Sequence, residues 1–178
     1  MLENQITDLV ETHLFTSDQK LKRWGNGEWV EEPDEVTFNY RGIKCLILRI
    51  ASQYLELGHL CGYIEINLEH PWAKEDPFKL NLDVHGGITY GNEQKSGVYR
   101  VGFDCAHSMD VCPSVEKILK EVREKSKDSE HGKAAIAFEE KHKKDCPYLF
   151  MKSYKNIEFC KLQCMSLAEQ AIEVKEGK

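Results

Sequence analysis

Two short motifs carry the residues of this sequence that could do chemistry. Asp83 and His85 lie in the stretch DVHGG at residues 83–87, and Asp104 and His107 lie in FDCAH at residues 103–107. Carboxylate and imidazole groups together bind zinc, manganese or iron, and a metal ion held by them can activate water for hydrolysis. Without a metal ion, aspartate and histidine can transfer protons or hold a polar ligand. The motifs therefore leave three chemistries open.

Alternating apolar and polar residues predict that both motifs lie on one antiparallel hairpin. The two stretches with this pattern are residues 80–90 and 98–105. Side chains alternate between the two faces of a strand, so one face of the hairpin should be buried. If Val84 and Phe103 are buried neighbours, Asp83 lies opposite Asp104. A slip by one residue would mix the faces, so burial favours this register.

The same register sets His85 opposite Gly102 and gathers a polar face on the hairpin. Glu65 joins this face if its strand lies alongside. Directly opposed carboxylates repel each other, so we expect a shared proton or a cation between Asp83 and Asp104. That cation is a metal ion, protonated His85 or Arg100.

The predicted site follows from this face. The expected ligand-binding residues are Glu65, Asp83, His85, Gly86, Gly87, Arg100 and Asp104. The expected metal ligands are His85, Asp104 and His107, with zinc or manganese as the ion. As a hydrolase, the protein would use Asp83 or Glu65 as the general base. The alternative is that these are ordinary solvated residues on an outer sheet face, although the neighbouring glycines leave room for a ligand against the backbone.

The elements that must position the site are mainly strands, followed by helices. Besides the hairpin, strands are expected at residues 36–40, 43–50 and 61–67. Helical spacing of apolar residues predicts a short helix at 4–14, an amphipathic helix at 115–122 and a long helix at 157–174 that covers one face of the sheet. The fold class is therefore a single α+β domain with a mainly antiparallel sheet, a short N-terminal helix and a long C-terminal helix.

The chain divides into four segments within this one domain. They are an N-terminal helix and connector at 1–35, a sheet core at 36–112, a charged helical excursion at 113–150 and the C-terminal helix at 151–178. The 178 residues include 41% apolar ones, which is enough for a core. A formal net charge of −6 argues against direct DNA binding, because nucleic-acid binders need a clustered positive surface.

No apolar run reaches the length of a membrane span, and the first residues lack the pattern of a signal peptide. We therefore expect a cytoplasmic protein with no membrane contact. The seven cysteines should be thiols or metal ligands in that reducing compartment, and their odd number favours free thiols over a disulfide framework.

The motifs resemble those of a widespread family of small proteins from tailed bacteriophages and prophages. The resemblance covers residues 30–112 and 154–172 and is carried by CGYI at 61–64, HP at 70–71, DVHGGITY at 83–90 and GFDCAH at 102–107. It implies an accessory phage protein in the bacterial host cytoplasm. Such a protein would inhibit a host defence pathway by holding a host defence protein or a small polar, nucleotide-like ligand. The alternatives are the metal-dependent hydrolase and a structural or virion-associated protein.

Overall fold

The computed structural model describes residues 5–51, 56–146 and 151–175, and it contains a six-stranded antiparallel sheet with the strand order β1-β2-β3-β4-β6-β5. The strands are β1 (Ile6–Thr12), β2 (Glu35–Tyr40), β3 (Ile43–Arg49), β4 (Leu60–Asn67), β5 (Tyr90–Glu93) and β6 (Val98–Asp104). The helices are α1 (Ser17–Trp24), α2 (Pro113–Ser126), α3 (Glu130–Asp145) and α4 (Ile157–Lys175).

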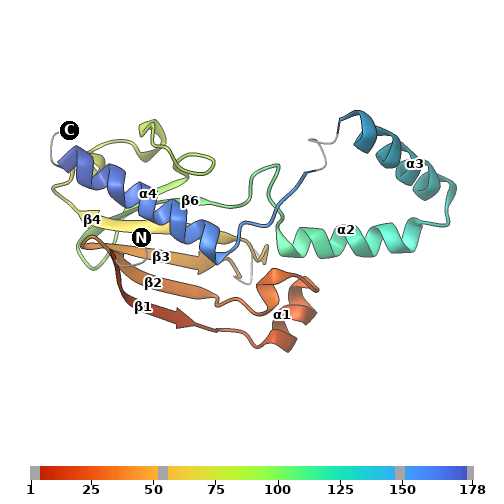
Figure 1. Cartoon of the computed structure of the whole chain (residues 1–178), viewed down its shortest axis with the longest axis horizontal. Coiled ribbons are helices and arrows are strands. Elements are labelled where there is room, and N and C mark those ends of the chain that lie inside the picture. The colour runs from red at the N-terminus through yellow and green to blue at the C-terminus, as the bar shows by residue number, and fades with distance from the viewer. Residues whose placement is uncertain (1–4, 52–55, 147–150, 176–178) are drawn as a thin grey trace.

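Helix α4 covers one face of the sheet and forms the core with it (Figure 1). Alternate residues of the central strands point toward the helix and are buried, among them Phe38, Ile47, Ile64, Val101 and Phe103. The helix contributes Cys160, Cys164, Leu167, Ala168 and Ala171 at helical spacing. The predicted α+β fold, with a long C-terminal helix on one sheet face, is confirmed.

The hairpin of β2 and β3 forms where the sequence predicts it. Its two turn residues, Arg41 and Gly42, both have positive φ, at 49° and 83°. Two such residues make the tight turn whose twist matches that of antiparallel strands, and glycine adopts this conformation at little cost. The strands predicted at 36–40, 43–50, 61–67 and 98–105 are all present, each with one end shifted by a single residue.

The predicted helix at 4–14 is wrong. This stretch contains β1, which pairs with β2 at the edge of the sheet. The short N-terminal helix exists but lies later, in α1. It begins where the hydroxyl of Thr16 accepts a hydrogen bond from the backbone N–H of Gln19, forming a capping box. The apolar residues Ile6, Leu9 and Val10 have helical spacing, but strand pairing with β2 decides the conformation.

The predicted strand at 80–90 is also wrong for most of its length, and so is the predicted hairpin register. Strand β5 begins only at Tyr90, and Tyr90 rather than His85 lies opposite Gly102. Residues 80–89 form an irregular segment on the α4 side of the sheet. Its alternation is real, since Leu82 and Val84 pack against the core. The backbone of Asp83 and His85, however, bonds to side chains of α4, and only Thr89, next to β5, bonds to the backbone of β6.

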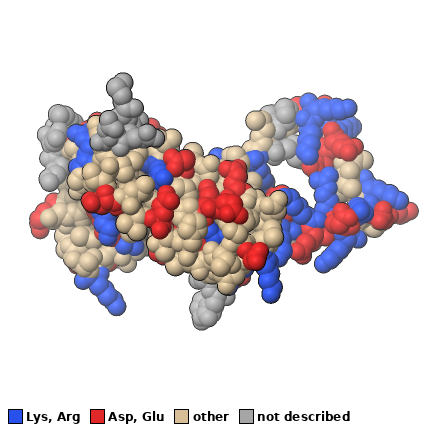
Figure 2. All heavy atoms as spheres, turned by 60° about the horizontal axis from the view of Figure 1, so that its bottom comes forward, with Lys and Arg blue, Asp and Glu red and all other residues tan. Residues whose placement is uncertain are grey.

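Helices α2 and α3 form an arm that projects beyond the sheet (Figure 1). Each of them buries a single residue, Pro113 in α2 and Gly132 in α3. Basic and acidic residues intermingle over the arm (Figure 2). The predicted charged excursion at 113–150 is therefore helical in its described part, residues 113–145.

All seven cysteines are free thiols, as predicted, and five of them are buried. None of the helices in the described part of the chain has the length and apolar character needed to cross a membrane.

Candidate metal centre

His85, His107 and Asp110 bring three potential metal ligands together. The Oδ2 atom of Asp110 lies 2.8 Å from Nε2 of His85 and 3.2 Å from Nδ1 of His107. The three ligand atoms all lie within 4.8 Å of one another. Within residues 5–51, 56–146 and 151–175, no other group of three or more histidine, cysteine and acidic side chains has this geometry.

Helix α4 holds the segment that carries His85. The side-chain oxygen of Gln163 accepts a hydrogen bond from the backbone N–H of His85 at 2.7 Å. Gln170 bonds to both the N–H and the carbonyl of Asp83, at 2.9 and 3.0 Å. The ring of Phe159 meets the imidazole of His85 edge-on, with centroids 5.2 Å apart. The helix therefore fixes both the backbone and the ring of His85.

The FDCAH motif ends β6 and places His107 in the turn that follows. Asp110 lies at the end of this turn, where its backbone N–H bonds to the carbonyl of His107 at 2.9 Å. The chain on either side of Asp110 bonds to Ser153, which precedes α4. Both bonds hold the carboxylate in place at only 5% exposure.

The ionisation state of Asp110 suits a metal ligand. Burial alone would raise the pKa of its carboxyl group. Hydrogen bonds from the side chain of His85 and from the backbone and ring of His107 outweigh burial and hold this pKa below its ordinary value. The Oδ1 atom is buried and has no hydrogen-bond partner. A carboxylate with a vacant oxygen is therefore present at neutral pH.

Two of the three distances between ligand atoms are close to those expected around a single first-row metal ion. With metal–ligand bonds of about 2.1 Å, neighbouring ligand atoms stand roughly 3.0 Å apart in octahedral geometry and roughly 3.4 Å apart in tetrahedral geometry. The two distances to Asp110 Oδ2 fall in or close to this range. Two histidines and one carboxylate leave coordination positions open to water or substrate, as in catalytic zinc and iron sites. The side chains of His85 and His107 are 21% and 34% exposed, so solvent reaches the centre.

Of the three predicted metal ligands, the structure brings together His85 and His107 but not Asp104. Asp104 lies opposite Cys61 on the face of the sheet away from α4, and its Oδ1 atom accepts a hydrogen bond from the N–H of Ala106. The expected pair of opposed acids, Asp83 and Asp104, does not form, because the hairpin that would align them is absent. Asp110 takes the place predicted for Asp104.

The predicted ligand-binding residues are divided between the two faces of the sheet. Asp83, His85, Gly86 and Gly87 lie on the α4 side. Glu65, Arg100 and Asp104 lie on the opposite face. Glu65 therefore cannot serve as a general base at the metal centre.

Glu65 and Arg100 form a cross-strand ion pair between β4 and β6, with Arg100 Nη2 2.6 Å from Glu65 Oε1. Lys44 approaches the other carboxylate oxygen at 3.2 Å. Burial would raise the pKa of Glu65, but the hydrogen bonds from Arg100 and Lys44 lower it below its ordinary value. This group accounts for the polar character of the open sheet face.

Asp110 is not among the metal ligands predicted from the sequence, although a signal for it is visible there. Asp110 follows His107 by three residues, and a tight turn brings residues at this spacing together. The contacts of Phe159, Gln163 and Gln170 with Asp83 and His85 could not be predicted from the sequence, because they depend on how α4 lies against residues 80–89.

Cysteine chemistry is not supported near the centre. The thiols of Cys105 and Cys160 lie 3.7 Å apart in the core. Their hydrogen bond and burial raise the pKa of Cys105 well above its ordinary value, whereas a nucleophilic cysteine needs a lowered pKa.

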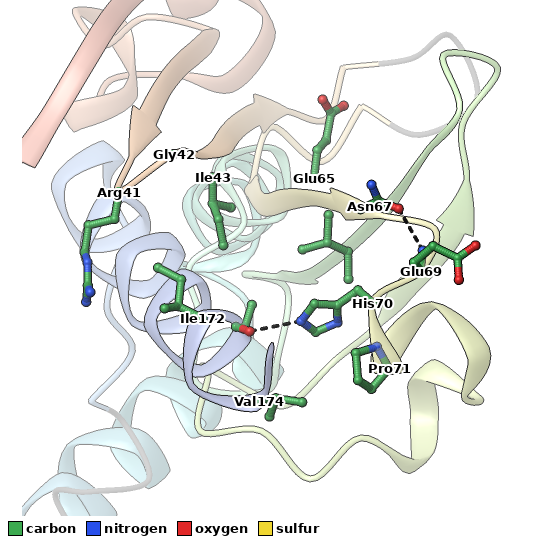
Figure 3. Close-up of a pocket in the computed structure, with 12 residues that line it drawn as sticks. Arg41, Gly42, Ile43, Glu65, Asn67, Glu69, His70, Pro71, Ile172 and Val174 are labelled. Atoms are coloured by element: carbon green, nitrogen blue, oxygen red, sulfur yellow. Dashed lines mark hydrogen bonds between the residues drawn. The ribbon is translucent and has the colours of Figure 1, made fainter. Parts of the chain in front are cut away.

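A hollow of about 910 Å³ lies elsewhere, between the β2–β3 turn, the end of β4 and the C-terminal part of α4 (Figure 3). None of the three metal-centre residues lines it. His70 at its wall donates from Nε2 to the carbonyl of Ala171 at 3.0 Å and accepts at Nδ1 from the N–H of Trp72. Both ring nitrogens of His70 are engaged in hydrogen bonds to the backbone, so this histidine is not available to bind a metal ion in the hollow.

No protein-family model, curated protein or solved structure matches this chain, so the resemblance to phage proteins stays a prediction.

Proposed function

We propose that this protein is a metal-dependent hydrolase that binds one divalent ion, zinc foremost, through His85, His107 and Asp110. The observation that carries the proposal is that one histidine from each sequence motif, His85 and His107, meets the buried carboxylate of Asp110. When bound, the ion lowers the pKa of a coordinated water so that the water becomes a nucleophile near neutral pH. Asp83, exposed two residues before His85, remains the proposed general base.

Metal analysis of the purified protein tests this proposal. After growth with added zinc, the protein should hold about one ion per chain, and His107→Ala or Asp110→Ala should remove most of it, because three protein ligands are the usual minimum for a stable site. His142→Ala is the matched control, since this half-buried histidine lies on α3 and its ring bonds to the carbonyl of Phe138 and stacks on the Phe138 ring. A wild-type protein without metal, or equal loss in the control, would contradict the proposal.

A second candidate, an accessory phage protein that inhibits host defence by binding, is favoured by the arm. Val115, Ile118, Leu119 and Val122 share one face of α2, and each is at least 40% exposed. Exposed apolar stripes of this kind mark surfaces that contact other proteins. Direct DNA binding remains the least favoured mode, because the net charge is −6.

Phage plating on bacteria that carry a defined defence system separates the two candidates. If binding through the arm is the function, expression of the protein restores plaques, and Leu119→Gln with Val122→Gln abolishes this effect while His107→Ala does not. If hydrolysis is the function, His107→Ala abolishes the effect on plaques, and Leu119→Gln with Val122→Gln does not. Failure of all these proteins to affect plating would leave the structural or virion-associated alternative.

A further inference from the structure

Lys155 places its ammonium group beside the proposed metal centre. Its Nζ atom lies 3.8 Å from Oδ1 of Asp110 and 5.1 Å from the centroid of the Phe159 ring. The same ring contacts His85 edge-on. Lys155 and His85 therefore flank one aromatic ring, and both approach one carboxylate.

At 3.8 Å, the distance between Lys155 Nζ and Asp110 Oδ1 is too long for neutralisation of Asp110 to be the main role of Lys155. Charge-assisted hydrogen bonds between nitrogen and oxygen are about 2.7–2.9 Å long. Lys155 instead donates to the hydroxyl of Ser153 at 2.6 Å, and Oδ1 of Asp110 has no hydrogen-bond partner. An ammonium group has three donors, so the bond to Ser153 leaves two that can meet a ligand. The side chain is 19% exposed, which allows a ligand to reach it.

The charges around the centre favour a dianion. A divalent ion and the two charged side chains in contact at the centre, Asp110 and Lys155, together carry a net charge of about +2 when the two imidazoles are neutral. The exposed carboxylate of Asp83, the proposed general base, lies outside these contacts. The acid next along the chain, Glu158, lies 2.8 Å from Lys161 and is paired with it. A carboxylate ligand would neutralise half of the excess charge, whereas a phosphoryl group would neutralise nearly all of it at neutral pH.

We infer that the centre takes a phosphate monoester and that Lys155 binds its phosphoryl oxygens. This inference rests on the proposed function and adds the substrate class to it. Hydrolysis of such an ester joins the oxygen of water to phosphorus, breaks the bond from phosphorus to the ester oxygen, and transfers a proton to the departing alcohol. Lys155 is the specificity-determining residue in this scheme, because its ammonium group favours a phosphoryl group over a carboxylate as the ligand beside the metal ion.

Cobalt substitution and inorganic phosphate provide the test. Cobalt(II) bound at the centre gives a visible spectrum that responds to a new ligand. Phosphate should change this spectrum in the wild type, and acetate should bind more weakly. Lys155→Met should weaken phosphate binding by about tenfold, the loss expected for one charge-assisted hydrogen bond, while cobalt stays bound. Lys152→Met is the matched control, since Lys152 is an exposed lysine three residues earlier, and should change phosphate binding by less than about twofold.

Each other outcome has a distinct meaning. Bound cobalt with no response to phosphate, or acetate binding as tightly as phosphate, overturns the substrate class and leaves the metal centre standing. Unchanged phosphate binding in Lys155→Met, together with a lower melting temperature, shows that Lys155 is only a counter-ion to Asp110. A wild-type protein that binds no cobalt overturns the proposed function, and this inference with it.

Discussion

The ring of His107 rests against the backbone of Gly86, which has a φ of 67°. A Cβ atom at this position would lie 1.9 Å from Cε1 and 2.0 Å from Nε2 of that ring. The neighbouring Gly87 also has positive φ, at 81°, but a Cβ atom there would meet open space. The two glycines of the motif thus have the same backbone requirement and different steric surroundings. Only Gly86 permits the close approach of the two histidine-bearing loops.

Alanine at each glycine should separate these two effects. Gly87→Ala should cost about 1 kcal/mol of folding free energy, the cost of a left-handed conformation with a Cβ atom. Gly86→Ala adds displacement of the His107 ring, so we expect a cost of roughly 3 kcal/mol and weaker zinc binding. Denaturant unfolding and zinc titration of the two variants measure both quantities. Equal zinc affinities would show that His107 does not need its present position.

His59 is a second residue whose environment has a measurable consequence. It immediately precedes β4, is 5% exposed, and its Nδ1 atom has no hydrogen-bond partner. Burial lowers the pKa of His59 below its ordinary value of 6.5. The charges of Asp104 and Asp110 partly oppose this shift, and Arg49 adds to it. The folded protein therefore takes up this proton at lower pH than the unfolded chain does.

The sign of the resulting pH dependence is fixed by linkage. Below about pH 6.5 the unfolded chain binds a proton that folded His59 does not, so the free energy of unfolding falls as the pH decreases. His59→Phe removes this contribution. Relative to the variant, the wild type should lose stability between pH 7 and pH 5 in denaturant unfolding experiments. A constant difference between the two proteins across this range would contradict the assignment.

At the scale of elements, the sequence predicts strands well where their partners are also strands. In β2, Val36 and Phe38 alternate with polar residues, and in β3 Cys45 and Ile47 belong to a nearly continuous apolar run. All four are buried in the core against α4. Residues 80–89 show a similar alternation without forming a strand, and at Asp83 and His85 the side chains of Gln170 and Gln163 provide hydrogen bonds that a neighbouring strand would supply. Alternation of apolar and polar residues thus reveals which side chains are buried, but not which groups form hydrogen bonds with the backbone N–H and carbonyl groups. For this reason the sequence predicted two of the three metal ligands and an incorrect third one.

A buried ionic group that the sequence did not predict joins several elements. Oδ1 of Asp34 lies 3.1 Å from Nζ of Lys20 in α1 and 3.0 Å from Nε of Arg49 in β3, and all three side chains are fully buried. Oδ2 of Asp34 accepts hydrogen bonds from the backbone after β1. Arg49 also bonds to Glu32 and to Tyr154, which precedes α4. The group ties the N-terminal segment to the sheet and to the start of α4.

Removal of the charge of Asp34 should therefore destabilise the whole fold. Asp34→Asn leaves two buried cations without their shared carboxylate, and the expected cost is about 3–5 kcal/mol in denaturant unfolding. Glu35→Gln is the matched control, because the half-buried Glu35 begins β2 outside this group, and it should change stability by less than about 0.5 kcal/mol. Similar effects of the two substitutions would mean that Lys20 and Arg49 do not depend on Asp34.

At the scale of the whole molecule, the body and the arm differ in what holds them. The body has a core between the sheet and α4, whereas α2 and α3 bury almost nothing of their own. Isolated helices of this length are marginal in water, and most helical stability in proteins comes from packing of an apolar face. Polar contacts hold the arm. Within it, Arg123 of α2 forms an ion pair with Glu139 of α3, and Lys117 of α2 bonds to backbone carbonyls near the end of α1 in the body.

Substitutions in the apolar stripe of α2 should therefore leave the folding stability of the body unchanged. Leu119 and Val122 are 51% and 56% exposed, so Leu119→Gln and Val122→Gln should each change the free energy of unfolding by less than about 0.5 kcal/mol. Leu167→Gln in α4 is the contrasting control. Leu167 is fully buried in the core, and an amide without a partner there should cost about 3 kcal/mol or more. If the α2 variants unfold as readily as Leu167→Gln, the stripe packs against the body in solution. The stripe would then not be available to a partner protein, and the binding function proposed for the arm would be contradicted.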